Sequence, residues 1–306
     1  MSTAILCPGQ GAQKVGMGVA WSDSSAAARE IFHRCSETLG FDLAKLCAEG
    51  PAEELTRTDV CQPAILAVSA ASLAAREEKA EAEDRANVQG ALGLSLGEYT
   101  ALYVAGVLLL EDAVRLVRLR GIAMQEASDD PPSGMTSVIG ADREAAEALC
   151  AKASADGGVC VVANLNCPGQ VVISGDNAAL DRADAIAEQE KVGRTVRLDV
   201  AGAFHSPLME PARGRLEEAI AQTEFKAPQF SVVSNATGEP SKDPETLRCN
   251  LVRQLTSPVL FEASLRRTIA DGTTEFLELS PGRVLAGFMR KIDRGFPVEI
   301  CDGRAA

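Results

Sequence analysis

The pentapeptide Gly93-Leu94-Ser95-Leu96-Gly97 constrains the fold of this chain more than any other stretch. It follows an apolar run that predicts a strand (residues 88–94) and leads into one that predicts a helix (residues 96–105). A strand that turns into a helix so abruptly crowds its own backbone, and glycines two positions before and after the serine relieve the crowding. The pattern therefore predicts a nucleophile elbow, with the serine hydroxyl clear of the sheet.

A serine held in this way is a candidate nucleophile. It would lie near the positive end of the following helix, where main-chain N–H groups, especially that of Leu96, can stabilise an oxyanion. A serine needs a base, and the chain contains only His33 and His205. His33 lies within a predicted helix, so we expect it to be structural or exposed. His205 lies in a loop between a predicted strand and helix, where α/β folds place their sites, and we expect it to be the base.

Three further features remain open from the residues alone. Asp199 is a weak candidate for the third member of a triad, and a backbone carbonyl could orient the imidazole equally well. The loop Pro8-Gly9-Gln10-Gly11 is either a flexible turn or a loop whose Gln10 amide faces the ligand edge of the sheet. Arg120 flanks the apolar stripe of a predicted helix; composition favours a surface arginine, whereas a semi-buried one would bind a carboxylate or phosphate.

Strands and helices alternate over both ends of the chain, which predicts a mostly parallel sheet covered on both faces. The expected strands are residues 3–7, 88–94, 230–234 and 275–279. The expected helices are residues 24–39, 63–80, 96–105, 111–127, 208–222, 244–255, 259–271 and 282–292.

The middle of the chain has a different order of predicted elements, which begins after a Pro- and Gly-containing break at residues 128–134. Strands are expected at residues 135–140, 159–164, 170–175 and 193–199, and helices at 142–155 and 176–189. This βαββαβ order is the ferredoxin-like pattern. The fold class is therefore α/β, with a hydrolase-like core at residues 1–127 and 200–306 and an inserted ferredoxin-like subdomain at residues 128–199.

Composition excludes several classes of function. The net charge of −13 would repel a phosphate backbone, so we expect no nucleic-acid partner. Nine cysteines without a C-x-x-C pair, and only two histidines, argue against a zinc site or a disulfide framework. The longest apolar run, residues 101–110, is about half of a membrane helix. With no visible signal peptide, we expect a cytoplasmic protein that does not contact a membrane, in which the charge run at 77–85 is a solvated helix end and loop.

Six motifs occur in register along nearly the whole chain. They are Pro8-Gly-Gln-Gly-Ala-Gln13, Gly93-Leu-Ser-Leu-Gly-Glu-Tyr99, Arg118-Leu-Arg-Gly-Ile-Ala-Met-Gln125, Asn164-Leu-Asn-Cys-Pro-Gly-Gln-Val-Val-Ile-Ser-Gly175, Gly202-Ala-Phe-His-Ser-Pro-Leu-Met209 and Leu251-Val-Arg-Gln-Leu255. In their order and spacing, these motifs resemble the malonyl-CoA:acyl carrier protein transacylase family of fatty-acid synthesis.

The resemblance implies a role for each matching catalytic residue. Ser95 would carry the malonyl group as an ester, and His205 would serve as general base and then as general acid. Gln10 and the N–H of Leu96 would form the oxyanion hole. Gln254 would lie beside His205, where main-chain carbonyls rather than an acid orient the imidazole.

The resemblance also implies how substrate is bound. Arg120 would pair with the free malonyl carboxylate, and Asn164 and Asn166 would line the cleft between the subdomains. Leu94 is a departure, because many family members have histidine there; it is not the catalytic base, so activity should survive. The stretch Gly-Ala-Phe-His at residues 202–205 is similar to the malonyl-selecting form of polyketide acyltransferase domains, which disfavours bulkier extender units.

The implied activity is a ping-pong transfer of malonyl from malonyl-CoA to the phosphopantetheine thiol of acyl carrier protein. It requires no metal and no cofactor, and the family resemblance implies a monomer. The alternatives are a freestanding acyltransferase that serves a polyketide synthase, a serine thioesterase or lipase-like hydrolase, and a catalytically inactive binding protein.

Overall fold

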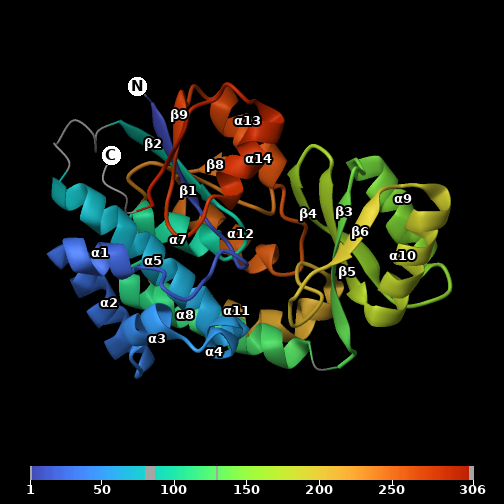
Figure 1. Cartoon of the computed structure of the whole chain (residues 1–306), viewed down its shortest axis with the longest axis horizontal. Helices are drawn as coiled ribbons and strands as arrows, with labels where there is room; N and C mark the ends of the chain where they lie inside the picture. Colours follow the sequence, from blue (N-terminus) through green and yellow to red (C-terminus); the bar gives the residue numbers. More distant parts are fainter. Residues whose placement is uncertain (1, 80–86, 129, 303–306) are drawn as a thin grey trace.

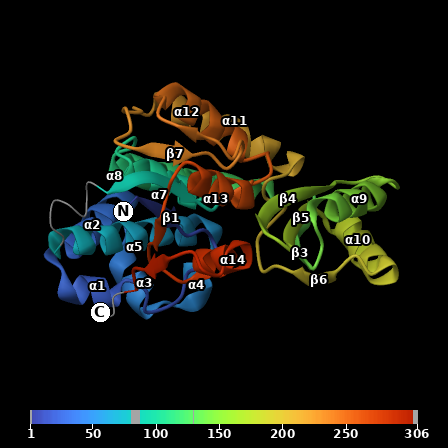
Figure 2. The same ribbon diagram turned by 90° about the horizontal axis from the view of Figure 1, so that it is seen from above.

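The computed structural model describes residues 2–79, 87–128 and 130–302, in a large part and a smaller part that Figures 1 and 2 show side by side. The large part contains a six-stranded sheet in the order β10-β9-β1-β2-β7-β8. Its strands are β1 (Thr3–Cys7), β2 (Val88–Gly93), β7 (Ser231–Val233), β8 (Pro240–Ser241), β9 (Glu275–Glu278) and β10 (Val298–Ile300). Every neighbouring pair is parallel except β7 and β8, which confirms the predicted mostly parallel sheet.

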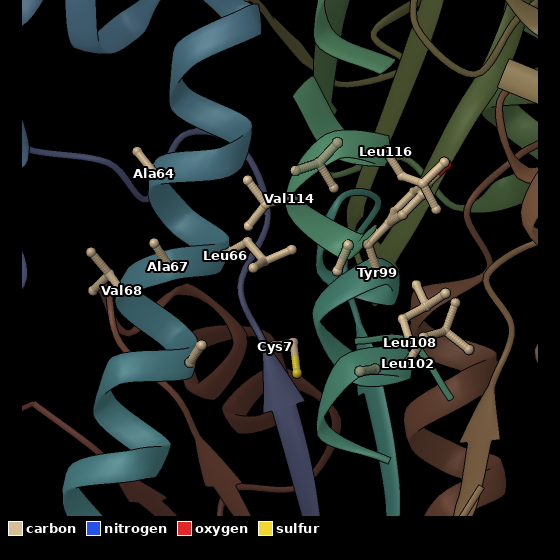
Figure 3. Packing of buried hydrophobic residues seen from close by; sticks show 14 of the residues in the cluster. Cys7, Ala64, Leu66, Ala67, Val68, Tyr99, Leu102, Leu108, Val114 and Leu116 are labelled. Atoms are coloured by element: carbon tan, nitrogen blue, oxygen red, sulfur yellow. The ribbon is translucent and has the colours of Figure 1, made fainter. Parts of the chain in front are cut away.

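Helices cover both faces of this sheet because alternate residues of its central strands point to opposite sides. In β1, Ile5 and Cys7 pack into the core formed with α2, α5, α7 and α8, part of which Figure 3 shows. Ala4 and Leu6 pack on the other face with α13 and α14. The helices of the large part are α1 (Val19–Ser24), α2 (Ala26–Leu39), α3 (Leu43–Glu49), α4 (Ala52–Thr56), α5 (Thr58–Lys79), α7 (Gly97–Val104), α8 (Leu110–Ala127), α11 (Glu210–Gln222), α12 (Pro244–Gln254), α13 (Phe261–Ala270) and α14 (Val284–Ile292).

Helix α5 is the one described helix long and apolar enough to cross a membrane by length and composition. It runs through the middle of the large part, and 83% of its apolar window is buried against neighbouring elements. Its composition is therefore that of a core helix. It begins at Thr58, five residues before the predicted start. The predicted charge run at residues 77–85 lies outside the described residues from position 80 onward.

The smaller part is a separate antiparallel sheet with two helices. Its strands are β3 (Ser133–Ile139), β4 (Cys160–Cys167), β5 (Gln170–Asp176) and β6 (Arg194–Arg197), in the order β4-β5-β3-β6. Helices α9 (Arg143–Ser154) and α10 (Asn177–Glu190) pack on the face away from the large part, over their own apolar core (Figure 2). The opposite face of this sheet is therefore free to form one wall of a cleft.

The two parts are joined through β4 and the segment that leads into α13. The N–H of Leu165 donates to the carbonyl of Val259 at 2.9 Å, and the N–H of Val259 donates to the carbonyl of Ala163 at 2.8 Å. This parallel bridge fixes Asn164 and Asn166 of β4 at the boundary with the large part. The short elements α1, α3, α4, β8 and β10 were not predicted, because two to seven residues carry little periodic signal.

Candidate active site

The elbow lies where β2 ends and α7 begins, and its glycines are required by backbone sterics. A Cβ atom on Gly93 would lie 2.0 Å from the carbonyl of Gly97, and one on Gly97 would lie 2.2 Å from the carbonyl oxygen of Cys7. Ser95 between them has a φ of 54°, in the left-handed region that non-glycine residues rarely adopt. The surrounding hydrogen bonds must hold this strained serine in place.

Ser95 faces His205 across 110 residues of sequence. Ser95 Oγ lies 2.7 Å from His205 Nε2, and His205 Nδ1–H donates to the carbonyl oxygen of Gln254 at 2.9 Å. Because a carbonyl can only accept, the proton is on Nδ1 and Nε2 is free to take the serine proton. Asp199 is exposed on the cavity wall, and no hydrogen bond within the described residues joins it to His205. His33 is 63% exposed beside Glu37.

The environment of His205 keeps its imidazole neutral. The side chain is 3% exposed; burial, followed by the charge of Arg120, lowers its pKa to about 4, against the opposing effect of the hydrogen bond to Gln254. A neutral imidazole is the form that can act as a base.

We expect the pH profile of nucleophile reactivity to report this shift. An unshifted imidazole would lose reactivity about tenfold between pH 6 and pH 5, whereas one with a pKa near 4 should lose less than about threefold over that interval. The measurement is the rate at which a fluorophosphonate probe labels Ser95 in the intact protein. A continued tenfold loss per pH unit below pH 6 would show that the imidazole titrates normally.

Arg120 lies in the interior, contrary to the surface position that composition alone favoured. It is 1% exposed, and its guanidinium donates to Gln62 Oε1 at 2.8 Å, Ser95 Oγ at 2.9 Å and Gln254 Oε1 at 3.2 Å. Burial lowers its pKa, and no carboxylate in the described part of the chain forms an ion pair with it. A buried guanidinium with only neutral hydrogen-bond partners is suited to take a carboxylate from a ligand.

Asn235 and Glu98 hold the elbow from behind. Asn235 Oδ1 accepts from the N–H of Ser95 at 2.7 Å, and its amide donates to the carbonyl of Gly93 at 2.7 Å. Glu98 Oε2 accepts from Gln254 Nε2 at 2.7 Å and from the N–H of Asn235 at 3.1 Å. Sequence reasoning missed Gln62, Glu98 and Asn235; the one available signal was a charged residue, Glu98, within an apolar helix.

The same hydrogen bonds leave one backbone donor free beside the nucleophile. The N–H of Ser95 is engaged by Asn235, whereas the N–H of Leu96 has no acceptor among the described residues. Gln10 follows β1, the strand beside β2, and lines the same cavity as Ser95. Leu96 and Gln10 are therefore both placed where a donor could meet an oxyanion beside Ser95 Oγ.

A cavity of about 560 Å³ opens over the serine between the large part and the small sheet. Ser95, His205 and Gln10 lie on its wall from the large part, and Asn164 and Asn166 lie on its wall from β4. Asn166 is buried, and its Oδ1 has no hydrogen-bond partner among the described residues. Arg120 and Gln254 are not among the residues that line the cavity; both are buried and contact Ser95 from the interior. Among the described residues, no group of histidine, cysteine or acidic side chains could hold a metal ion.

Comparison with known proteins identifies the family. The sequence profile of the acyl transferase domain matches residues 5–295. The malonyl CoA-acyl carrier protein transacylase of Bacillus subtilis is 40% identical over 291 residues, which is 95% of this chain and 90% of that protein. The solved acyl-carrier-protein S-malonyltransferase of Bartonella henselae superposes with a TM-score of 0.95 at 36% identity, covering 100% of this chain and 96% of that one.

The chain is also similar to a transacylase solved in complex with its carrier protein. A malonyl-transacylase solved together with its type II polyketide acyl carrier protein matches with a TM-score of 0.93 at 35% identity, over 99% of this chain and 96% of that chain. The chain belongs to the acyl transferase domain family and, within it, to the malonyl-CoA:acyl carrier protein transacylases.

Proposed function

We propose that this enzyme transfers a malonyl group from malonyl-CoA to the phosphopantetheine thiol of acyl carrier protein in fatty-acid biosynthesis. The observation that carries the proposal is the pair of contacts on Ser95 Oγ, with His205 Nε2 at 2.7 Å and the guanidinium of Arg120 at 2.9 Å. A base beside the serine supports acyl transfer. A buried cation beside the same hydroxyl supports an acyl group that carries its own carboxylate.

The first half-reaction loads the enzyme. His205 Nε2 takes the proton of Ser95 Oγ while the oxygen attacks the thioester carbonyl of malonyl-CoA. The N–H of Leu96 and the amide of Gln10 stabilise the oxyanion of the tetrahedral intermediate. The C–S bond then breaks, the CoA sulfur receives the proton from His205, and the malonyl group remains as an ester on Ser95.

The second half-reaction runs the same chemistry in reverse with a different thiol. His205 takes the proton of the carrier phosphopantetheine thiol, and the sulfur attacks the ester carbonyl. The C–O bond breaks, and Ser95 Oγ recovers the proton from His205. These steps use only side chains and backbone groups of this chain, so the proposed mechanism requires no metal or cofactor.

Arg120 selects the substrate in this proposal. Removing a guanidinium from water is costly, and a malonyl carboxylate offsets that cost whereas the methyl group of acetyl-CoA leaves the cation unpaired. Asn164 and Asn166 line the route to Ser95 from the small sheet, and the unpartnered Oδ1 of Asn166 is available to a donor on the substrate.

We also propose that the smaller part has a ferredoxin-like fold and that the large part has a hydrolase-like core. The strand order β4-β5-β3-β6 with α9 and α10 on one face supports a ferredoxin-like subdomain at residues 128–199. The elbow at the end of a parallel strand supports a hydrolase-like core at residues 1–127 and 200–306. A cytoplasmic location is supported by nine free cysteines, eight of which are buried, and by bacterial relatives; a monomer remains an expectation from the resemblance.

A second candidate is a freestanding acyltransferase that serves a polyketide synthase. It is favoured by the close likeness to the malonyl-transacylase solved with its polyketide carrier. The chemistry is the same, and only the carrier differs. A thioesterase or hydrolase is less well supported, because water as acceptor gives no reason for a buried arginine on the nucleophile.

Incubation with labelled malonyl-CoA should give one malonyl group per protein by intact mass, and addition of phosphopantetheinylated carrier should move the label to the carrier. Fatty-acid and polyketide carriers tested in parallel would decide between the two pathways. Rapid release of free malonate in the absence of any carrier would contradict the transferase and favour the hydrolase.

A further inference from the structure

Glu98 is a buried carboxylate that the proposed mechanism does not use. It is the second residue of α7, three positions after Ser95, and is 1% exposed. A glutamate in the first turn of a helix commonly accepts from the amides of its own helix. Glu278, the last residue of β9, caps a neighbouring helix in a comparable way, since it accepts from the N–H groups of Leu285 and Ala286 at the start of α14. The donors to Glu98 come instead from α12 and from the loop after β7.

One donor, Gln254, connects Glu98 to Ser95, His205 and Arg120. Its Nε2 donates to Glu98 Oε2 at 2.7 Å and to the carbonyl of Ser95 at 2.9 Å. Its Oε1 accepts from Arg120 at 3.2 Å, and its main-chain carbonyl accepts from His205 Nδ1–H at 2.9 Å. A change in the hydrogen bond to Glu98 is therefore transmitted to the nucleophile, the base and the guanidinium together.

A second donor, Asn235, connects Glu98 to the strained elbow. The main-chain N–H of Asn235 donates to Glu98, while its side chain holds the N–H of Ser95 and the carbonyl of Gly93. By occupying the N–H of Ser95, Asn235 leaves that of Leu96 as the backbone donor for an oxyanion. Glu98 thus anchors both supports of the site through a single carboxylate oxygen.

Charge strengthens this arrangement. Arg120 forms no ion pair within the described residues, and the negative charge of Glu98 acts on it across Gln254. The groups that face Glu98 are the Arg120 guanidinium from α8, the Tyr99 phenol on its own helix, and the neutral donors Gln254, Asn235 and Ser234. An ionised carboxylate accepts stronger hydrogen bonds than a neutral acid, so its ionisation tightens both supports.

We propose that Glu98 is the positioning residue of this site, holding Gln254 and Asn235 so that Ser95, His205 and Arg120 are aligned, and supplying the negative charge that offsets the buried guanidinium. The acid of a catalytic triad would contact the histidine directly. Here Gln254 contacts His205, and Glu98 contacts Gln254, so the carboxylate acts through one intervening residue. The proposal rests on the proposed function only for the identity of the acyl group.

The ionisation of Glu98 gives the proposal a measurable signature. Burial raises its pKa to about 7, against the hydrogen bonds from Gln254 and Asn235 and the charge of Arg120. As the pH rises through this value the carboxylate ionises, the supports tighten and the reactivity of Ser95 should increase. This step is distinct from the loss expected near pH 4, at which His205 is protonated.

The test is the rate of Ser95 labelling by a fluorophosphonate as a function of pH, which needs no assumption about the acyl substrate. The unaltered protein should show a rise of about fivefold between pH 6 and pH 8, equivalent to about 1 kcal/mol in the barrier. In Glu98→Gln the amide oxygen can still accept both hydrogen bonds, but the charge is gone. This variant should label about tenfold more slowly at pH 8 and show no step near pH 7.

Substrate kinetics provide a second measurement. Since Glu98 does not contact malonyl-CoA, Glu98→Gln should lower kcat more than it raises KM. Glu111→Gln on α8 is the matched control, because it removes a half-exposed carboxylate that pairs with Arg34 away from the cavity. It should leave the labelling profile unchanged, and thermal unfolding of both variants checks that they are folded.

Three results would overturn the proposal: an unaltered protein without the step, a Glu98→Gln variant that keeps it, or a variant that labels like the unaltered protein at every pH. If the step is present and is lost in Glu98→Gln while malonyl-CoA loads neither protein, the positioning role stands and the malonyl transferase assignment fails.

Discussion

Ser95→Ala protein is expected to acquire no malonyl group from malonyl-CoA, and its transfer rate to carrier should fall at least about a thousandfold. The variant retains the cavity, the neutral His205 and the buried Arg120, but it lacks the oxygen that forms the ester. The hydroxyl is held at 2.7 Å from Nε2 by a left-handed backbone that no other serine in the described part of the chain adopts. Intact mass after brief incubation with malonyl-CoA measures the loss.

The exposed thiol of Cys249 provides the control for this result. It is the one exposed cysteine of the nine, and it could acquire an acyl group by simple thioester exchange. Cys249→Ser should load like the unaltered protein, and the adduct should resist neutral hydroxylamine, which cleaves thioesters faster than oxygen esters. A malonyl adduct that persists in Ser95→Ala and disappears in Cys249→Ser would place the acyl group on the wrong residue.

Arg120→Ala should abolish the preference for malonyl-CoA over acetyl-CoA and lower kcat/KM for malonyl-CoA by at least about a hundredfold, equivalent to about 2.7 kcal/mol. The variant leaves the malonyl carboxylate buried without a cation, whereas the acetyl group loses no partner. Because Arg120 also donates to Ser95 Oγ and Gln254 Oε1, rates with both substrates should fall. The ratio of the two kcat/KM values is therefore the decisive quantity.

One further variant separates the charge of Arg120 from its shape, and a second serves as a control. Arg120→Lys keeps the cation but loses the planar fork, so it should retain part of the malonyl preference. Arg115→Ala on the same helix removes an exposed arginine that pairs with Asp112, and it should change neither rate. If Arg120→Ala still prefers malonyl-CoA by the original ratio, another group binds the carboxylate.

The elements with strong periodicity were predictable, and their ends lie close to the predicted ones. β1 occupies the predicted residues, and α8 begins one residue before the predicted start. The elements that were not predicted are short: α1, α3, α4, β8 and β10 contain seven residues or fewer. A two-residue strand such as β8 exists only because β7 is beside it, so no local pattern can indicate it.

The site residues also divide into those with a local sequence signal and those without one. The elbow was visible because part of its requirement is local: the steric conflict that excludes a side chain at Gly93 arises from Gly97, four residues away, whereas the conflict at Gly97 arises from Cys7 on the neighbouring strand. His205 was found because only two histidines exist and one lies in a loop. Gln254 entered through resemblance alone, and Asn235 gave no local signal, since an asparagine in a loop has many ordinary uses.

The sequence by itself determined the short-range chemistry of this protein: the strand-to-helix turn, its two glycines, and the serine between them. Tertiary structure decided everything that depends on distance and on exclusion of water. Asn235 and Gln254 meet Ser95 from 140 and 159 residues away. Asn235 does so because it follows β7, the parallel neighbour of the strand that leads into Ser95, and Gln254 because it ends α12 beside that edge of the sheet. The same enclosure buries Arg120 and lowers the pKa of His205 to about 4, since desolvation is a property of the assembled fold rather than of a residue or its neighbours in sequence.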